Sequence, residues 1–291
     1  MPADAPHRAG VVAILGRPNA GKSTLLNRLL GEKIAITSAK PQTTRSRILG
    51  ILTREGFQIL FFDTPGLHES TRALNVALNE IVDAAAKDCD VGLLLVDPYG
   101  GWGADHAALH DRLRARGCPV IVASTKADLE NRRSAAWPAD APARREISAA
   151  TGEGVDALVA EIAGQLPISP PLYPEDQLSD RPLRFLAAEL IREAAFEELS
   201  CELPYALAVE VVEFDESRPD LVKIRADLLV ERRSQKQIAI GAGGEMIKRI
   251  GVRARGEIEA LLGKQVHLAL WVKLEPRWAR QPKRLKSLGY S

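Results

Sequence analysis

The sequence predicts an α/β protein in two parts: a mostly parallel β-sheet with helices on both faces, followed by a smaller α+β domain. Short apolar runs at residues 11–15, 58–62, 91–96 and 119–123 have the length of buried strands, and helical patterns separate them. A proline-rich passage at residues 167–174 then breaks any regular element. Because 291 residues are long for one core, two domains are expected.

The second part has its own order of elements. Apolar residues at helical spacing predict a helix at 183–199, strands follow at 207–214 and 221–230, and two helices precede a last strand at 267–274. The predicted order is therefore α-β-β-α-α-β. The expected divisions are an N-terminal tail at 1–8, a first domain at 9–168, a linker at 169–182, a second domain at 183–275 and a basic tail at 276–291.

The first strand and helix are joined by the segment GRPNAGKS at residues 16–23. A glycine-rich turn there directs backbone N–H groups and the helix dipole at one anion, which predicts a phosphate-binding loop rather than an ordinary turn with a solvated lysine. Gly16 and Gly21 permit the turn, Lys22 reaches the β and γ oxygens, and the Ser23 hydroxyl ligates Mg²⁺. The predicted nucleotide-binding residues of this loop are Gly16, Arg17, Pro18, Asn19, Ala20, Gly21, Lys22, Ser23 and Thr24.

The strand at 58–62 leads into a second turn, DTPGL. An aspartate at the carboxyl end of a strand holds Mg²⁺ through water, while the N–H of Gly66 meets the γ-phosphate. The polar segment at 37–47 is predicted to order around nucleotide, with Thr44 or Thr43 as a second hydroxyl ligand; a flexible surface loop is the alternative. The predicted nucleotide contacts are Asp63, Thr64, Pro65, Gly66 and Leu67, and the predicted Mg²⁺ ligands are Ser23, Thr44 and Asp63.

The strand at 119–123 runs into the sequence TKAD, which predicts the base that is read. The carboxylate of Asp128 accepts from both N1–H and the exocyclic amine of guanine, and adenine offers no such pair, so the site selects GTP over ATP. Backbone N–H groups near Ser148 complete the pocket around the guanine oxygen. The predicted guanine-side residues are Thr125, Lys126, Ala127, Asp128, Ser148 and Ala149.

A GxxG turn lies between the two late helices of the second part. Such a turn lets a sugar-phosphate backbone approach closely, and together with the α-β-β-α-α-β order it resembles a type II KH domain, which clamps about four nucleotides. The turn itself lacks a cation, so flanking side chains must supply the charge. The predicted RNA-binding residues are Ile240, Gly241, Ala242, Gly243, Gly244, Lys248 and Arg249.

Charge supports a polyanion partner for this part. The net charge is +1, yet residues 223–291 carry 16 Lys and Arg against 6 Asp and Glu, whereas residues 1–222 carry 23 against 32. A basic third joined to an acidic remainder favours nucleic-acid binding, with a well-solvated surface as the alternative. The basic tail beside Trp278 suits RNA contact with one stacking ring, and a disordered tail is the alternative reading.

Other features limit the function classes. No apolar stretch is long enough to span a bilayer and the N-terminus does not have a signal-peptide pattern, so we expect a soluble, cytoplasmic protein. Cys89, Cys118 and Cys201 form no CxxC pair and are interpreted as isolated, reduced thiols. His106 and His110 have i, i+4 spacing, which we interpret as a solvated helix face rather than a metal site.

In their order, GRPNAGKS, PQTTR, DTPGL, TKAD and ISA are similar to the signature elements of the small GTPase superfamily, and the whole layout resembles the Era family of bacterial GTPases. The resemblance implies hydrolysis of GTP to GDP and phosphate with Mg²⁺. It also implies binding of small-subunit ribosomal RNA near its 3′ end during 30S assembly, and a fraction held peripherally at the inner face of the cell membrane. We expect a monomer.

Two positions depart from the pattern. Thr125 stands where the family has asparagine. Some of the bridging hydrogen bonds that asparagine makes should be lost, which predicts weaker nucleotide binding. Leu67 stands where many GTPases carry the glutamine that orients water, so intrinsic hydrolysis should be slow, and no catalytic residue is assigned. Leu67 also favours one alternative, an RNA-binding assembly factor that holds nucleotide without hydrolysing it. The other alternative is a membrane-remodelling GTPase of the dynamin kind.

Overall fold

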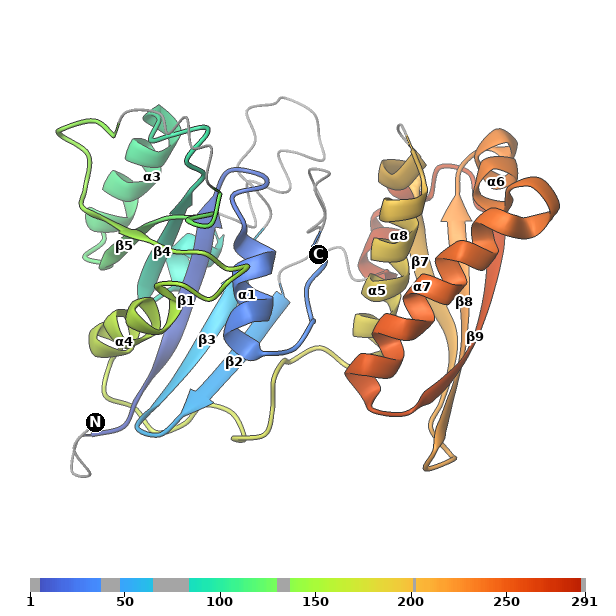
Figure 1. Ribbon diagram of the computed structural model, residues 1–291, viewed down its shortest axis with the longest axis horizontal. Coiled ribbons are helices and arrows are strands. Elements are labelled where there is room, and N and C mark those ends of the chain that lie inside the picture. The colour runs from blue at the N-terminus through green and yellow to red at the C-terminus, as the bar shows by residue number, and fades with distance from the viewer. Residues whose placement is uncertain (1–5, 38–47, 65–83, 130–136, 201–202, 289–291) are drawn as a thin grey trace. The chain divides into compact units, whose positions relative to one another are not determined.

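The computed structural model describes residues 6–37, 48–64, 84–129, 137–200 and 203–288. The chain divides into two compact units, and the division falls after Asp180, ahead of the first helix of the second unit (Figure 1). Among the described helices, none is long and apolar enough to cross a membrane. The two units are described one at a time.

The first unit is built on a six-stranded sheet in the order β2-β3-β1-β4-β5-β6. Among the described strands of this sheet, only β2 runs antiparallel to its neighbour, so the prediction of a mostly parallel sheet is confirmed. Strands β2 and β6 have no counterpart among the strands expected from sequence. The strands are β1 (Arg8–Gly16), β2 (Ile48–Arg54), β3 (Phe57–Asp63), β4 (Val91–Val96), β5 (Val120–Ser124) and β6 (Arg144–Glu146).

Helices cover both faces of this sheet, as predicted. A Cβ on Gly50 of β2 would lie 2.5 Å from Leu26 of helix α1 (Lys22–Leu30), so α1 packs directly on the backbone of one face. Side chains on the opposite face pack with Leu109 and Leu113 of α3 (Ala104–Arg114). Helix α4 (Val155–Gln165) contacts β1 and β3 and is the last helix of the unit. These layers place the carboxyl ends of the parallel strands along one edge.

The linker predicted at 169–182 runs against the first unit. Gln58, fully buried in β3, accepts the backbone N–H groups of Leu172 and Tyr173 at 2.7 and 2.9 Å. The Tyr173 ring packs on the cluster around Leu60, and Ser179 donates to the Leu49 carbonyl oxygen at 2.7 Å. The proline-rich segment is therefore fastened along one sheet face before the chain enters the second unit.

The second unit follows the predicted order α5 (Leu183–Glu198), β7 (Ala208–Asp215), β8 (Leu221–Val230), α6 (Arg233–Ile240), α7 (Glu245–Leu262) and β9 (Gln265–Leu274). Strand β7 is antiparallel to β8 and β8 is parallel to β9. Alternate β8 residues such as Ile224 and Leu228 point into a core shared with α5 and α7. Figure 1 shows these two helices on one side of the three strands.

The described part of the basic tail, residues 276–288, packs on the second unit. It forms a 3₁₀ turn (Trp278–Arg280) and a short helix α8 (Pro282–Ser287). The Trp278 ring is 2% exposed and packs with Ala208 and Leu229 on the sheet face away from α5 and α7. The expectation that Trp278 offers a stacking ring to RNA is therefore wrong, because the ring serves a small second core.

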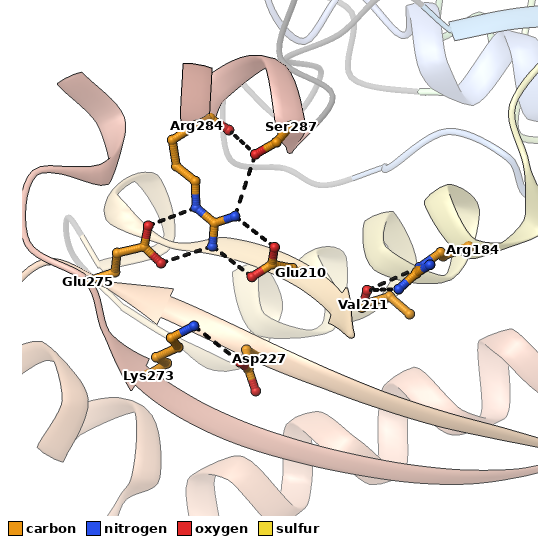
Figure 2. Close-up of polar contacts among 8 residues, drawn as sticks. All are labelled: Arg184, Glu210, Val211, Asp227, Lys273, Glu275, Arg284 and Ser287. Atoms are coloured by element: carbon orange, nitrogen blue, oxygen red, sulfur yellow. Dashed lines mark hydrogen bonds and ion pairs between the residues drawn. The ribbon is translucent and has the colours of Figure 1, made fainter. Parts of the chain in front are cut away.

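Arg284 fixes the tail electrostatically. Its guanidinium donates to both carboxylate oxygens of Glu210 at 2.7 Å and to those of Glu275 at 2.7 and 2.9 Å (Figure 2). The Arg284 side chain is 18% exposed, so water screens these pairs little. The tail hence acts as part of the second domain for residues 276–288, and one of its predicted RNA-facing cations is already occupied.

Candidate functional site

The phosphate loop has the backbone shape that its glycines predict. Gly16 closes β1 with φ of 146°, where a Cβ would lie 2.4 Å from the carbonyl oxygen of Leu95, and Gly21 precedes α1 with φ of 89°. No larger residue fits at Gly16 without moving β4. The loop therefore ends at a helix N-terminus whose first N–H groups are open to an anion.

Lys22 lies at the centre of this loop and is 6% exposed. Its ammonium donates to the carbonyl oxygens of Gly16 at 3.1 Å and Arg17 at 2.8 Å. Burial lowers the pKa of Lys22 to about 8, against the opposing attraction of Asp63. A buried cation with a lowered pKa gains most from an anionic partner, and polyphosphate is the partner that this loop is shaped to take.

Two of the three predicted Mg²⁺ ligands lie together. The Ser23 hydroxyl donates to Oδ2 of Asp63 at 2.7 Å, and Asp63 is fully buried at the end of β3. Beside it, the Thr64 hydroxyl donates to the Ile14 carbonyl oxygen at 2.7 Å and locks the start of the turn. A hydroxyl and a carboxylate at this spacing suit Mg²⁺, which prefers oxygen ligands together with substrate phosphates. Thr44, Pro65, Gly66 and Leu67 lie outside the described residues.

The guanine-side residues come together from two loops. Ser148 donates its hydroxyl to Oδ1 of Asp128 at 2.6 Å, and the Ala127 N–H donates to the Ile147 carbonyl oxygen at 3.0 Å. Asp128 is exposed, so its carboxylate is open to a ligand while Ser148 holds its orientation. The structure therefore brings together the predicted guanine-side residues Asp128 and Ser148, and it adds a hydrogen bond between them that the sequence did not predict.

The chain's departure at Thr125 is accommodated by packing. Thr125 is 2% exposed, and its side chain lies 3.9 Å from the place a Cβ would take on Gly21. Its hydroxyl is 3.5 Å from the Val96 carbonyl oxygen, the long limit of a hydrogen bond. Lys126, with φ of 57°, forms an ion pair with Asp97. Thr125 therefore faces Gly21 of the phosphate loop, where an added Cβ would be in ordinary van der Waals contact with it.

Sequence reasoning missed three residues that brace the site. Arg28 of α1 donates to the carbonyl oxygens of Ala149 and Ala150 and ties the guanine-side loop to the phosphate-loop helix. Asp105 receives two bonds from Arg17, at 2.7 and 2.6 Å, and Asp97 holds Lys126. Only the folding of the strands brings these partners together, since 88 positions separate Arg17 from Asp105.

The histidine spacing was wrongly interpreted as a solvated face. His106 is 1% exposed, stacks on Trp102 with ring centroids 5.6 Å apart, and accepts the Gly103 N–H at Nδ1. Burial lowers the pKa of His106, so the neutral ring is favoured. Within the part of the chain that the structure describes, no cluster of three His, Cys, Asp or Glu residues is arranged to hold a metal ion.

The GxxG turn has the expected backbone in the second unit. Gly241, Gly243 and Gly244 all have positive φ, and a Cβ on Gly241 would lie 2.7 Å from Cβ of Met246. Ala242 and Gly243 are exposed, and Ile240 is half-buried against the core. The turn therefore presents bare backbone to solvent at the start of α7, where a sugar-phosphate chain can approach.

A groove with a volume of about 280 Å³ lies between β9 and α7, the helix that follows this turn. Its walls combine apolar and basic side chains: Ile247, Lys248, Gly251, Val252, Arg255, Leu268 and Leu270. Arg249 does not line it and instead pairs with Glu198 of α5 at 3.0 Å. Of the two cations predicted to bind RNA, the groove therefore takes Lys248, and it adds Arg255.

Two family models match the chain. A model described as a 50S ribosome-binding GTPase matches residues 11–126, and a KH-domain model matches residues 202–279. Among curated proteins, the chain is 47% identical to GTPase Era of Geobacter metallireducens and 45% identical to GTPase Era of Ectopseudomonas mendocina, in each case over 99% of both chains.

Solved structures agree in fold with the whole chain. An Aquifex aeolicus Era variant bound to GDP·AlF4⁻ superposes with a TM-score of 0.88 at 37% identity, over 98% of this chain and 99% of the other. Era in complex with MgGDPNP and nucleotides 1506–1542 of 16S ribosomal RNA superposes equally well. The first unit is therefore a P-loop GTPase domain, the second is a KH domain, and GTP or GDP with Mg²⁺ is the ligand of the first.

Proposed function

Since this chain belongs to the Era family of GTPases, we propose that it is a GTP-driven switch that binds 16S ribosomal RNA near its 3′ end and acts in assembly of the 30S subunit. The observation that carries the proposal is that one chain has both a guanine-side pocket, in which Ser148 orients Asp128, and an exposed GxxG turn followed by the groove along α7. A nucleotide-holding factor without hydrolysis is disfavoured by the family, whose members are GTPases.

In the first domain, different residues bind the phosphates, the metal ion and the guanine base. The phosphate-loop N–H groups and Lys22 bind the β and γ oxygens. Ser23 and Asp63 would hold Mg²⁺, which would supply positive charge to offset the charge that develops on the phosphates. Asp128, oriented by Ser148, selects guanine. Leu67 offers no hydrogen-bonding group to the attacking water, which supports a slow intrinsic rate.

The guanine assignment is tested by exchanging the acceptor. Replacing Asp128→Asn should weaken GDP binding and shift preference toward xanthosine diphosphate, because an amide N–H complements the xanthine carbonyl. Asp111→Asn in α3, an exposed residue outside the predicted nucleotide-binding segments, is the matched control. Equilibrium titration with a fluorescent GDP measures both, and an unchanged preference in the Asp128 variant would contradict its role.

We propose that RNA lies in the groove along α7 and that Lys248 contacts its backbone, whereas Arg249 positions α7 against α5 through Glu198. Lys248→Gln should weaken binding of an RNA with the 16S 3′ sequence and reduce the salt slope by about 1. Arg249→Gln should leave that slope unchanged. Equal slopes for both variants would show that the groove does not discriminate the two cations.

The switch itself is tested by crosslinking. Protein loaded with a non-hydrolysable GTP analogue and protein loaded with GDP should recover 16S ribosomal RNA with different efficiency. Equal recovery would mean that the nucleotide state does not control RNA binding, which would contradict the switch. Single-turnover hydrolysis measured with and without the RNA should show a slow rate that RNA changes, if the two domains communicate.

The cellular setting is part of the proposal. We propose a cytoplasmic monomer with a fraction in peripheral contact with the inner face of the membrane, and this rests on the family resemblance. Sedimentation equilibrium checks the monomer, and fractionation of cells in low and high salt checks the peripheral fraction. A fraction that resists high salt would argue against peripheral contact.

A further inference from the structure

Two cysteines separated by 29 positions meet at one edge of the first sheet. Cys89 immediately precedes β4 and Cys118 precedes β5, and these neighbouring parallel strands pair Gly92 with Val120. Their sulfur atoms are 3.7 Å apart, which is van der Waals contact. Both are free thiols, as expected, but these two cysteines, which are isolated in sequence, are neighbours in the fold. Cys201, the third thiol, lies outside the described residues.

The pair is neither fully buried nor freely exposed. Both side chains are half-buried, and both pack against the cluster that includes Leu94, Leu109 and Val122. Each thiol also lies near carbonyl oxygens, Cys89 near Ala86 O at 3.7 Å and Cys118 near Pro119 O at 3.5 Å. Partial exposure allows a small oxidant to reach the sulfurs, and the packing holds them in contact.

The pKa values of the two thiols are shifted in opposite directions. The hydrogen bond from the Cys89 thiol lowers the pKa of Cys118 to about 7, helped by the Gly92 N–H and opposed by burial and by Asp90. The same hydrogen bond raises the pKa of Cys89. A thiolate is the nucleophile in sulfur chemistry, so Cys118 is the one that attacks at neutral pH.

We propose that Cys89 and Cys118 form a redox site in which a two-electron oxidant, hydrogen peroxide, makes a reversible intramolecular disulfide. The Cys118 sulfur attacks one peroxide oxygen, the O–O bond breaks, and hydroxide leaves and takes up a proton to become water. Cys118 is now a sulfenic acid. The Cys89 sulfur then attacks it, the S–O bond breaks, and a second water leaves with the Cys89 proton as the S–S bond forms.

The geometry requires only a local adjustment. The sulfurs must approach by about 1.7 Å to reach a disulfide bond length, which side-chain rotation at two loop residues can supply. A dithiol reductant returns the pair to thiols, as expected for an intracellular disulfide. The cysteines lie before β4 and β5, whereas Asp97 and the TKAD loop come after these strands. The length of the strands therefore separates the disulfide from the nucleotide loops by about 15–20 Å.

The test treats the full-length protein with hydrogen peroxide at pH 7 and maps tryptic peptides without reduction. The wild type and Cys201→Ser, the matched control, should both give a peptide pair linked through Cys89 and Cys118. Cys89→Ser should give no link and a lasting sulfenic acid at Cys118, trapped by dimedone. Cys118→Ser should react on the order of tenfold more slowly.

Three results would overturn the proposal. One is accumulation of sulfenic acid at Cys118 in the wild type to the level seen in Cys89→Ser. Another is linkage through Cys201 or between two molecules. The third is faster oxidation of Cys89 than of Cys118. GDP affinity should be the same before and after oxidation, and its loss would show that the link disturbs the nucleotide end of the strands.

Discussion

Replacing Arg284→Gln should destabilise the KH domain by about 2–3 kcal/mol. Arg284 donates to four carboxylate oxygens and is 18% exposed, while Glu210 and Glu275 are 31% and 23% exposed (Figure 2). Breaking a fully buried pair costs about 3–5 kcal/mol and a surface pair about 0–1, so this partly buried triad lies between them. The glutamine removes the guanidinium that bridges the two carboxylates, and Lys273 and Arg184 remain as the nearby cations of Glu210.

Native-state hydrogen exchange measures this loss within the KH domain alone. Peptides from β7 and β9 should exchange about 30- to 150-fold faster in Arg284→Gln, while peptides from β1 and β4 stay unchanged. Arg218→Gln is the control, because that arginine makes the same two-bonded contact with Asp220 but in full solvent. If Arg284→Gln and Arg218→Gln accelerated hydrogen exchange equally, burial of the Arg284 ion pairs would not be the source of their stabilising effect.

The same triad predicts a pH dependence. The hydrogen bond from Arg284 holds the pKa of Glu210 below its ordinary 4.5. A lowered carboxyl pKa contributes stability above the unfolded value, and that stability is lost as pH falls through the folded value. The difference in unfolding free energy between the wild type and Arg284→Gln should therefore be largest at pH 7 and should become smaller below about pH 4.

Three further predictions concern the two sites. GDP affinity, measured by titration, should be constant below pH 8 and fall as pH rises above it, because bound phosphate raises the pKa of Lys22 from its free value of about 8. Ser148→Ala should weaken GDP binding about five-fold in the same titration, since one hydrogen bond orienting the acceptor is worth about 1 kcal/mol. Gly241→Ala should reduce RNA binding in a filter assay, because its Cβ would lie 2.7 Å from the next helix, while Gly256→Ala, with open space around it, should not.

Much of the nucleotide site was predictable because its signals are local. Gly16 and Gly21 have positive φ angles, which other residues rarely adopt, so glycine at these positions predicts the turn. The apolar run before the loop has the length of a strand. The order of strands and helices in the KH domain followed from periodicity in the same way. Strand β2 was missed although its run ILGILTR is apolar; Gly50 interrupts the run, and a glycine inside a strand weakens the strand signal.

Contacts between distant positions could not be predicted in that way. Whether Trp278 meets RNA or a core depends on what the far side of the KH sheet leaves uncovered, and Ala208 and Leu229 leave an apolar patch there. Arg249 and Lys248 are neighbours in sequence, yet helix geometry turns them toward different surfaces, one to Glu198 and one to the groove.

The sequence by itself determined the class of chemistry, because the phosphate loop, the DTPG turn, the TKAD segment and the GxxG turn stand in one order along the chain. Each depends on a few consecutive residues whose backbone preferences are local. Only the tertiary structure decided which side chains brace these elements, among them Arg28, Asp105 and Arg284, and that Cys89 touches Cys118. Those partners lie far apart in sequence, and parallel strand pairing and core packing bring them together.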